Sequence, residues 1–415
     1  MKIVPFQKKP DRSFLIKLPA LFLAVLATFS ACSGSNNTSS TPIPLPNGQA
    51  GSLITANSSN LADCFAITST STGLSQCTSS ANGANGGVKA LGTFLSGSSS
   101  TPGLVVGTSV GTVNIVTNVD TTLSPIFCSV SSQKITAIAG VNNSSNYTNI
   151  FAAVGQNLYS SIGTSSNSCT FSSTLTTSAT AGTITGLAVY NGTLFGVTIN
   201  GYYFSIANAN TSNPATPSNL EPLPNYPVSG PIINGMAIDP NGLVFFADAS
   251  TNTANNGGQI TIYHVSSSTP NTLSPNNVQS YSGNNNGVAM SDPIGIAVSQ
   301  TTITNSNYCS TAPCDYIYLL NIGNSIQQYV MPVPTPINGG VSINPFNLPY
   351  TGCEMTNPAP ITSFPNLNSA PFTTSTASSG PLVFLGNNGS YSAGSCLGTT
   401  SAYGNNVVSY TIKGE

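Results

Sequence analysis

A three-strand pattern recurs along most of this chain, and it restricts the possible folds more than any other feature. Each repeat begins with a short segment in which small and apolar residues alternate. These segments are Ala90–Gly92, Ala137–Ala139, Gly186–Val189, Gly235–Ile238, Gly295–Val298 and Ser363–Phe364. Their first residues are 47, 49, 49, 60 and 68 positions apart. Short alternating stretches bounded by Gly, Asn, Pro and Ser are typical of β-strands, so the sequence predicts an all-β fold built from a repeated unit.

Each initial segment is followed by a second apolar strand, and a third strand follows a Gly/Asn turn. Second strands are predicted at Asn149–Val154, Thr193–Val197, Leu243–Ala247, Tyr316–Leu320 and Leu382–Leu385. Third strands are predicted at Asn157–Ile162, Gly201–Ile206, Gln259–Val265 and Asn406–Ile412. A four-stranded repeat at this period is typical of a β-propeller blade, so six repeats predict a six-bladed β-propeller. Small residues in the innermost strand would let the blades converge on an axis. The N-terminal segment Cys64–Thr70 is expected to supply the strand that closes the propeller. One or two β-sandwiches are the alternative.

The N-terminus has the pattern of an export signal. Five basic residues precede the apolar run Leu18–Phe29, which at about a dozen residues is shorter than the roughly 20 that a membrane-spanning helix needs. Phe29-Ser30-Ala31-Cys32 then resembles the lipobox of bacterial lipoproteins, although Phe29 stands where that family usually has Leu. This resemblance implies a signal peptide over 1–31, acylation of Cys32 (palmitate among the acyl chains), a flexible tether over 32–50 and a propeller domain over 51–415. Ordinary cleavage near Ala31 is the alternative.

The residue after the lipobox cysteine is Ser33 rather than Asp. In lipoproteins this implies transfer to the outer membrane of a Gram-negative cell. The sequence leaves open whether the protein faces the periplasm or the cell surface.

The cysteine count is consistent with export. Nine cysteines leave an odd one, and assigning Cys32 to lipid leaves eight that can pair. They lack the paired C-x-x-C spacing of zinc sites, so disulfides in an oxidising compartment are the prediction, with buried free thiols as the alternative. The proposed pairs are Cys64–Cys77, Cys128–Cys169, Cys309–Cys314 and Cys353–Cys396.

Charged residues are only 4% of the chain. From Cys32 onward, three lysines (Lys89, Lys134 and Lys413) and no arginine stand against nine carboxylates, which is a net charge of −6. Nucleic-acid binding needs a positive surface that neutralises phosphates, so this composition predicts no nucleic-acid partner. The same shortage argues against phosphorylated ligands and against recognition of anionic lipids by the folded part.

One repeat resembles a known type of blade. Gly235–Gly242, followed by Leu243–Asp248 and Ile260–Tyr263, resembles the blade of NHL-type and gluconolactonase-like (SMP-30) propellers, with an apolar strand, a D-P-x-G turn and an "apolar-apolar-A-D" strand. The absence of Trp excludes WD repeats. In the lactonase family, a Glu from the first blade helps to bind the metal. This chain from Cys32 onward has no Glu before Glu221, so lactonase activity is in doubt.

Two catalytic patterns occur, and each has a structural explanation. Gly107-Thr-Ser-Val-Gly111 matches G-x-S-x-G, but apolar strands flank it on both sides, so it is expected to be a hairpin rather than a nucleophile elbow. Ser131-x-x-Lys134 matches S-x-x-K, which requires a helix, whereas here a loop is expected. The single histidine, His264, has no neighbouring Cys or carboxylate in sequence and is expected to be packed or solvent-facing. No catalytic residue is assigned.

Three polar residues are the candidate ligand contacts: Asp248, Asn252 and Asp292. They fall on the side of the predicted propeller where second strands connect to third strands and where each blade connects to the next, and such loops commonly carry function. The spacing Asp248-x-Ser250-x-Asn252 also permits a weak Ca²⁺ site, although Thr253 replaces the Gly of an EF-hand turn. The alternative is a turn in which these side chains hydrogen-bond to their own backbone. No other cofactor is predicted.

Two function classes follow from these observations. The first is a lipid-anchored binding or scaffold module for a protein or glycan partner in the cell envelope. The second is a metal-dependent hydrolase of the lactonase-like propeller class, which would require carboxylates that converge on the central channel.

Overall fold

The structure is a computed structural model in which the chain divides into two units, Met1–Ser40 and Thr41–Glu415. All the described residues lie in the second unit. They are 88–96, 101–116, 126–143, 148–164, 169–226, 230–250, 257–269, 271–281, 290, 292–301, 313–322, 326–332 and 358–363, together with the strands at 52–55, 63–67, 74–77, 346–347, 382–387 and 407–411. The predicted signal peptide, Cys32 and the tether lie outside these residues.

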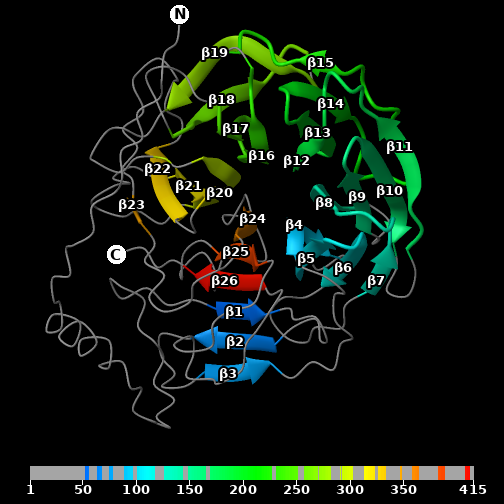
Figure 1. Ribbon diagram of the computed structural model, residues 1–415, viewed down its shortest axis with the longest axis vertical. Helices are drawn as coiled ribbons and strands as arrows, with labels where there is room; N and C mark the ends of the chain where they lie inside the picture. The colour runs from blue at the N-terminus through cyan, green and yellow to red at the C-terminus, as the bar shows by residue number, and fades with distance from the viewer. Residues whose placement is uncertain are drawn as a thin grey trace, which may run out of the picture. The chain divides into compact units, whose positions relative to one another are not determined.

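Antiparallel sheets make up the described part of the chain, which contains strands and turns but no helix (Figure 1). Sheet 1 comprises β4 (Val88–Ser96), β5 (Thr101–Thr108), β6 (Thr112–Val116) and β7 (Ile126–Ser129). Sheet 2 comprises β8 (Ala137–Asn142), β9 (Thr148–Val154), β10 (Asn157–Thr164) and β11 (Ser172–Thr176). Sheet 3 comprises β12 (Ile184–Tyr190), β13 (Thr193–Thr198), β14 (Tyr202–Ile206) and β15 (Glu221–Pro222).

The later part of the chain continues the same order. Sheet 4 comprises β16 (Ile233–Ile238), β17 (Leu243–Asp248), β18 (Gln259–Val265) and β19 (Leu273–Tyr281). Sheet 5 comprises β20 (Pro293–Thr301), β21 (Cys314–Asn321), β22 (Ile326–Pro332) and β23 (Phe346–Asn347). Sheet 6 comprises β24 (Pro358–Ser363), β25 (Leu382–Asn387) and β26 (Val407–Thr411). In all six sheets each strand pairs with the next one in the chain, so the predicted all-β class is confirmed.

The first strands of sheets 1 to 6 lie around a common centre (Figure 1). β4 contacts β8, β8 contacts β12, β12 contacts β16, β16 contacts β20, β20 contacts β24, and β24 contacts β4. The arrangement is propeller-like, with the later strands of each sheet farther from the centre. Small residues permit the close approach that the sequence predicts. A Cβ atom on Gly186 would lie only 2.8 Å from the Cβ atom of Met236 in the next first strand.

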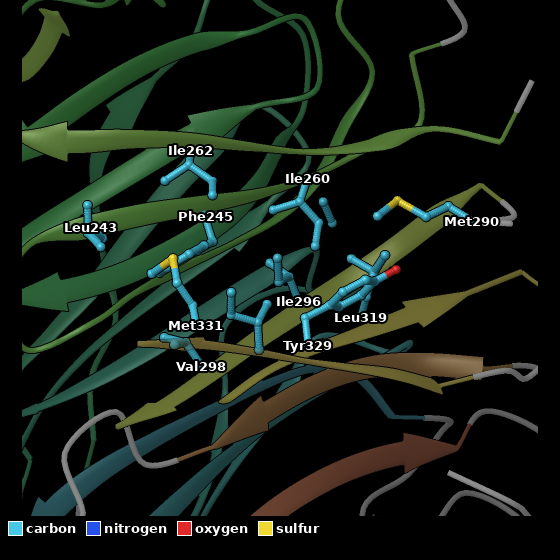
Figure 2. Close-up of a cluster of buried hydrophobic side chains, with 12 residues drawn as sticks. Leu243, Phe245, Ile260, Ile262, Met290, Ile296, Val298, Leu319, Tyr329 and Met331 are labelled. Carbon is cyan, nitrogen blue, oxygen red and sulfur yellow. The ribbon is translucent and has the colours of Figure 1, made fainter. Parts of the chain in front are cut away.

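The packing between neighbouring sheets follows the two-residue period of a strand. In β17, Phe245 and Ala247 face a cluster shared with sheet 5, which includes Ile317 and Tyr329 (Figure 2). Val244 and Phe246, which alternate with them, face the opposite cluster, shared with sheet 3. All four of these β17 side chains are fully buried. A strand of this kind is apolar throughout because both of its faces are covered.

The predicted closing strand differs in the structure. The segment Cys64–Thr70 is predicted to extend sheet 6. Its described part, within β2 (Asp63–Ile67), pairs instead with β1 (Ser52–Thr55) and β3 (Leu74–Cys77) in a separate N-terminal sheet. β1, rather than β2, contacts β26. The physical reason is local: strands joined by short connections pair with each other more readily than with a distant edge. The register places Cys64 opposite Cys77.

Candidate functional site

Two cavities lie along the centre between the first strands. One has a volume of about 270 Å³ and is lined by the beginnings of these strands; we call it the strand-start chamber. The other has a volume of about 340 Å³ and is lined by their later residues; we call it the strand-end chamber. Six buried apolar side chains line both chambers, one from each first strand, and we call them the apolar ring. The ring consists of Leu91, Ile138, Leu187, Met236, Ile296 and Ile361.

Irregular pairing at the beginning of the first strands shapes the strand-start chamber. The register between first and second strands shifts at Lys89, Thr185, Asn234 and Ile294, and each of these residues lines the chamber. A bulge of this kind leaves one residue outside the ladder and redirects its side chain. Three of these bulge residues, Lys89, Thr185 and Asn234, therefore bring polar groups into a wall that is otherwise mostly apolar.

Two of these bulge residues also connect neighbouring sheets. Thr185 Oγ1 donates a hydrogen bond to the carbonyl oxygen of Ile233 at 2.6 Å. Asn234 Nδ2 donates to the carbonyl oxygen of Pro293 at 2.8 Å. Each bond joins one first strand to the next. The bulges thus position chamber-lining groups and stabilise the contacts between sheets.

The strand-end chamber is more apolar. Its polar lining groups include Thr93, Ser363, Asn142 and Asn210. Thr93 Oγ1 donates to the carbonyl oxygen of Ser363 at 2.8 Å, and Ser363 Oγ donates to that of Val298 at 2.7 Å. These two hydroxyls therefore connect sheets 1, 6 and 5 rather than projecting free into the chamber.

Among the described residues that line the two chambers, Lys89 is the one with an ionisable side chain. Burial lowers the pKa of its ammonium group, and the positive charge of Lys134 lowers it further. Lys134 is exposed on the segment that leads into β8. The two lysines are 45 positions apart in the sequence but lie close enough to repel each other, a proximity that the sequence analysis did not anticipate.

The structure gives Asp248, a predicted ligand contact, a full set of protein partners. Its carboxylate is completely buried and accepts five hydrogen bonds. The donors are the Tyr226 hydroxyl, the backbone amide and hydroxyl of Ser250, Gln259 Nε2 at 2.6 Å and Thr261 Oγ1 at 3.1 Å. Burial and the negative charge of Asp248 raise the pKa of Tyr226, which keeps the phenol protonated as a donor. The two bonds from Ser250 match the turn that was the alternative to a Ca²⁺ loop.

The other two predicted ligand contacts are Asn252 and Asp292. Asn252 lies outside the described residues. Asp292 is half-buried and has a positive φ of 44° immediately before β20. Its amide donates to the carbonyl oxygen of Gly257, and its carbonyl oxygen accepts from the amide of Ile322. The ligand-binding role of these residues stays a prediction.

The connections do gather at one end of the sheets, as predicted. The carbonyl oxygen of Gly155, in the turn between β9 and β10, accepts a hydrogen bond from Ile184 at the start of β12. The Gly257–Asp292 bond likewise joins the second-to-third connection of sheet 4 to the start of β20. Within the described ranges, no group of three or more His, Cys, Asp or Glu side chains could hold a metal ion.

The two catalytic patterns have the structures expected for them. Gly107–Gly111 covers the end of β5 and the tight turn into β6, so it is a hairpin. Ser131–Lys134 is a loop in which Ser131 Oγ bonds the backbone of Gln133. His264 is half-buried in β18, and its Nδ1 contacts the carbonyl oxygen of Val265.

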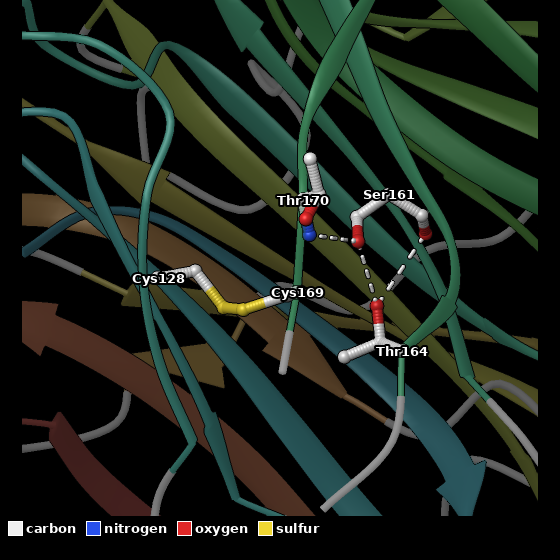
Figure 3. The surroundings of a disulfide bond; sticks show 5 residues. All are labelled: Cys128, Ser161, Thr164, Cys169 and Thr170. Atoms are coloured by element: carbon white, nitrogen blue, oxygen red, sulfur yellow. Dashed lines mark hydrogen bonds between the residues drawn. A yellow bond between two sulfur atoms is a disulfide. The ribbon is translucent and has the colours of Figure 1, made fainter. Parts of the chain in front are cut away.

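A disulfide joins Cys128 to Cys169, one of the four predicted pairs (Figure 3). Cys128 lies in β7, the last strand of sheet 1, and Cys169 precedes β11, the last strand of sheet 2, with 6.0 Å between their Cα atoms. Cys314 is also disulfide-bonded, whereas its predicted partner Cys309 lies outside the described residues. So do Cys353 and Cys396, and the side chains of Cys64 and Cys77.

Two acidic side chains meet between sheets 4 and 5, and the sequence analysis missed them. Asp239 follows β16, and Asp315 lies in β21; both are buried. Gln300 Nε2 donates to Asp315 Oδ1 at 2.9 Å, but Asp315 Oδ2 is buried and accepts from no donor. The two carboxyl groups hydrogen-bond to each other only if one of them keeps its proton. Burial raises the pKa of both acids, and the negative charge of Asp239 raises that of Asp315 further.

A sequence signal for one member of this pair exists. Asp239 Oδ1 accepts from the backbone amides of Asn241 and Leu243, as expected for the D-P-N-G turn. Its partner, 76 positions later in the chain, carries no such signal.

Comparisons with known proteins give similarity in structure but not in sequence. No protein-family model matches the chain, and no curated protein matches it. A crystal structure of a protein from Lactobacillus plantarum aligns with a TM-score of 0.49 at 11% identity, over 81% of this chain and 88% of that one. A luciferin-regenerating enzyme aligns with a TM-score of 0.45 at 11% identity, over 79% and 93%. The computationally designed Ika8 protein aligns with a TM-score of 0.39 at 10% identity, over 86% and 80%.

These similarities are too weak to carry an argument about activity. The description as propeller-like rests on the sheets and their contacts. The described residues also contain no helix that is long and apolar enough to cross a membrane.

Proposed function

We propose that the protein is an outer-membrane lipoprotein whose folded part is a six-bladed β-propeller, and that it acts as a binding module for a protein or glycan of the cell envelope. The six first strands and their successive contacts, which include the contact of β24 with β4, support six blades. The Cys128–Cys169 bond supports residence in an oxidising compartment, where exported proteins form disulfides.

The observation that carries the binding role is the chemistry of the two chambers. Their described lining is apolar with Ser, Thr and Asn side chains and one lysine, Lys89, and it includes no Asp, Glu, His or Cys. Binding sites combine apolar surface with a few fixed polar groups in this way. A lactonase-like hydrolase would bring carboxylates to the same centre, whereas Asp248, Asp239 and Asp315 are buried within and between sheets.

The side of the sheets that carries the connections from second to third strands and from one sheet to the next is called the loop face. Asp292, rather than Asp248, is the suitable position at which to test it. Replacing Asp248 would leave several buried donors without an acceptor, so any loss of binding could come from misfolding. Asp292 is half-buried, and its backbone amide and carbonyl oxygen make the two hydrogen bonds described above. Asp292→Asn keeps the size of the side chain and removes its charge. Asn also tolerates a positive φ, so the backbone is not strained.

The experiment combines an anchor test with partner capture. Wild-type protein and Cys32→Ala are expressed in a Gram-negative host with a clickable palmitate, and the label is expected only on the wild type. Envelope proteins and glycans are then crosslinked to wild type and to Asp292→Asn. The proposal predicts a partner whose recovery falls at least about fivefold with Asp292→Asn. Label on Cys32→Ala would contradict the anchor, and unchanged recovery would contradict the loop face.

A further inference from the structure

The strand-start chamber contains a positive charge that no described group neutralises. Lys89 lines the chamber, and the one charged side chain acting on it is Lys134, which is also positive. None of the described carboxylates lines the chamber: Asp248 is saturated with hydrogen bonds, Asp239 and Asp315 face each other, and Glu221 accepts from the Tyr203 hydroxyl. A partly buried ammonium group without an acceptor is unfavourable, and a second cation nearby increases the cost.

This local charge is opposite in sign to the rest of the chain. From Cys32 onward the chain has three lysines against nine carboxylates; one of those lysines lines this chamber, and the charge of a second one acts on it. An anion that entered the chamber would interact with both cations, and a charge-assisted hydrogen bond to Lys89 would be stronger than a neutral one.

The other residues that line the strand-start chamber indicate which further chemical groups a ligand needs. The apolar ring forms one end of the chamber, and Lys89, Thr136, Thr185 and Asn234 line the other. The Thr185 hydroxyl donates to a backbone carbonyl oxygen, whereas Asn234 Nδ2 uses one N–H group in this way and has a second one. With about 270 Å³, the chamber has the volume of about nine water molecules at roughly 30 Å³ each.

We propose that the strand-start chamber binds a small monocarboxylate with a short apolar tail, whose carboxylate bonds Lys89 and whose tail contacts the apolar ring. Lys134, an exposed cation whose charge acts on Lys89, strengthens the site. The tail displaces water from Leu91, Ile138, Leu187 and their counterparts, which provides the hydrophobic part of the affinity. This site depends neither on the lipid anchor nor on an envelope partner.

The test uses the full chain, purified in a nonionic maltoside detergent, and calorimetric titration with hexanoate. Hexanamide serves as the neutral probe with the same tail, and acetate as the charged probe without one. Hexanoate is expected to bind at least about tenfold more tightly than either, because only hexanoate uses both the cation and the ring.

Substitutions then assign the charge. Lys89→Gln is expected to weaken hexanoate binding at least about tenfold and to leave hexanamide unchanged, whereas Lys89→Arg keeps the charge and retains binding within about threefold. Lys134→Gln, the matched exposed control, is expected to weaken binding only about two- to threefold. If Lys89→Gln does not fold, the comparison of hexanoate with hexanamide on the wild type decides. Equal affinities for those two probes, no hexanoate binding, or unchanged affinity in Lys89→Gln would overturn the proposal.

Discussion

The boundary between sheets 1 and 2 and the boundary between sheets 4 and 5 are held by different chemistry. At the first, the disulfide Cys128–Cys169 links the last strands of two sheets covalently (Figure 3). At the second, Asp239, Gln300 and Asp315 meet beside a large apolar cluster (Figure 2). The covalent link acts mainly on the unfolded chain, whereas the acid pair acts on the folded state. The first boundary is therefore sensitive to reduction and the second to pH.

The largest effect is expected from removing the covalent link. Cys128→Ser with Cys169→Ser opens a loop of 41 residues and is expected to lower the free energy of unfolding by about 2–4 kcal/mol. Urea unfolding followed by tyrosine fluorescence measures the change. Ser129→Ala with Thr170→Ala is the matched control, because it alters exposed neighbours and keeps the bond. Equal stability of the cysteine variant and this control would show that the bond adds nothing to the boundary.

A smaller effect of opposite sign is expected at the acid pair. Both acids have raised pKa values in the folded state, so between the ordinary carboxyl pKa and the raised value the folded chain binds more protons than the unfolded chain. Stability therefore falls as the pH rises through this window. Asp315→Asn supplies a neutral donor to Asp239 and is expected to add about 1 kcal/mol at neutral pH.

Thermal unfolding from pH 4 to pH 8 measures this effect. The Tm of Asp315→Asn is expected to exceed that of the wild type at pH 8, and the difference is expected to shrink toward pH 4. Gln300→Met provides the matched contrast, because it removes the donor to Asp315 Oδ1 and is expected to destabilise the protein. A constant Tm difference across the whole pH range would argue against proton sharing.

The smallest effect is expected from the loss of one hydrogen bond at the boundary between sheets 3 and 4, which an apolar cluster also holds. Thr185→Val removes the bond from Thr185 Oγ1 to the carbonyl oxygen of Ile233 and is expected to cost about 0.5–1.5 kcal/mol. Urea unfolding again measures the change, with the exposed Thr180→Val as control. If Thr185→Val lowers the free energy of unfolding as much as the double cysteine variant does, then one hydrogen bond matters as much as the disulfide, and the contrast between the boundaries is wrong.

The ligand residues chosen from the sequence show which neighbours local reasoning leaves out. Asp248 attracts notice because it ends an apolar strand in a polar loop, but its environment comes from Tyr226, Gln259 and Thr261, none of which adjoins it in the chain. Lys89 looked isolated in sequence, yet it lines a chamber beside Lys134.

The strands of the repeats and their order within successive sheets could be predicted from the sequence alone. Alternation with a period of two and turns rich in Gly and Asn are local properties, so predicted strands such as Leu243–Ala247 and Gln259–Val265 lie within a residue of β17 and β18. The Cys128–Cys169 bond could also be predicted, because the repeat places Cys128 in one outer strand and Cys169 just before the neighbouring one.

Only the tertiary structure decided which groups meet across repeats. Three features join segments that are far apart in the chain: the pair Asp239 and Asp315, the repulsion between Lys89 and Lys134, and the apolar ring. A fourth, the placement of Asp63–Ile67 in a separate sheet, depends on which of two possible neighbours the strand pairs with. Burial and charge depend on every group within a few ångströms, whatever its position in the sequence. The sequence pattern of one strand therefore does not predict which residues of other repeats will surround it.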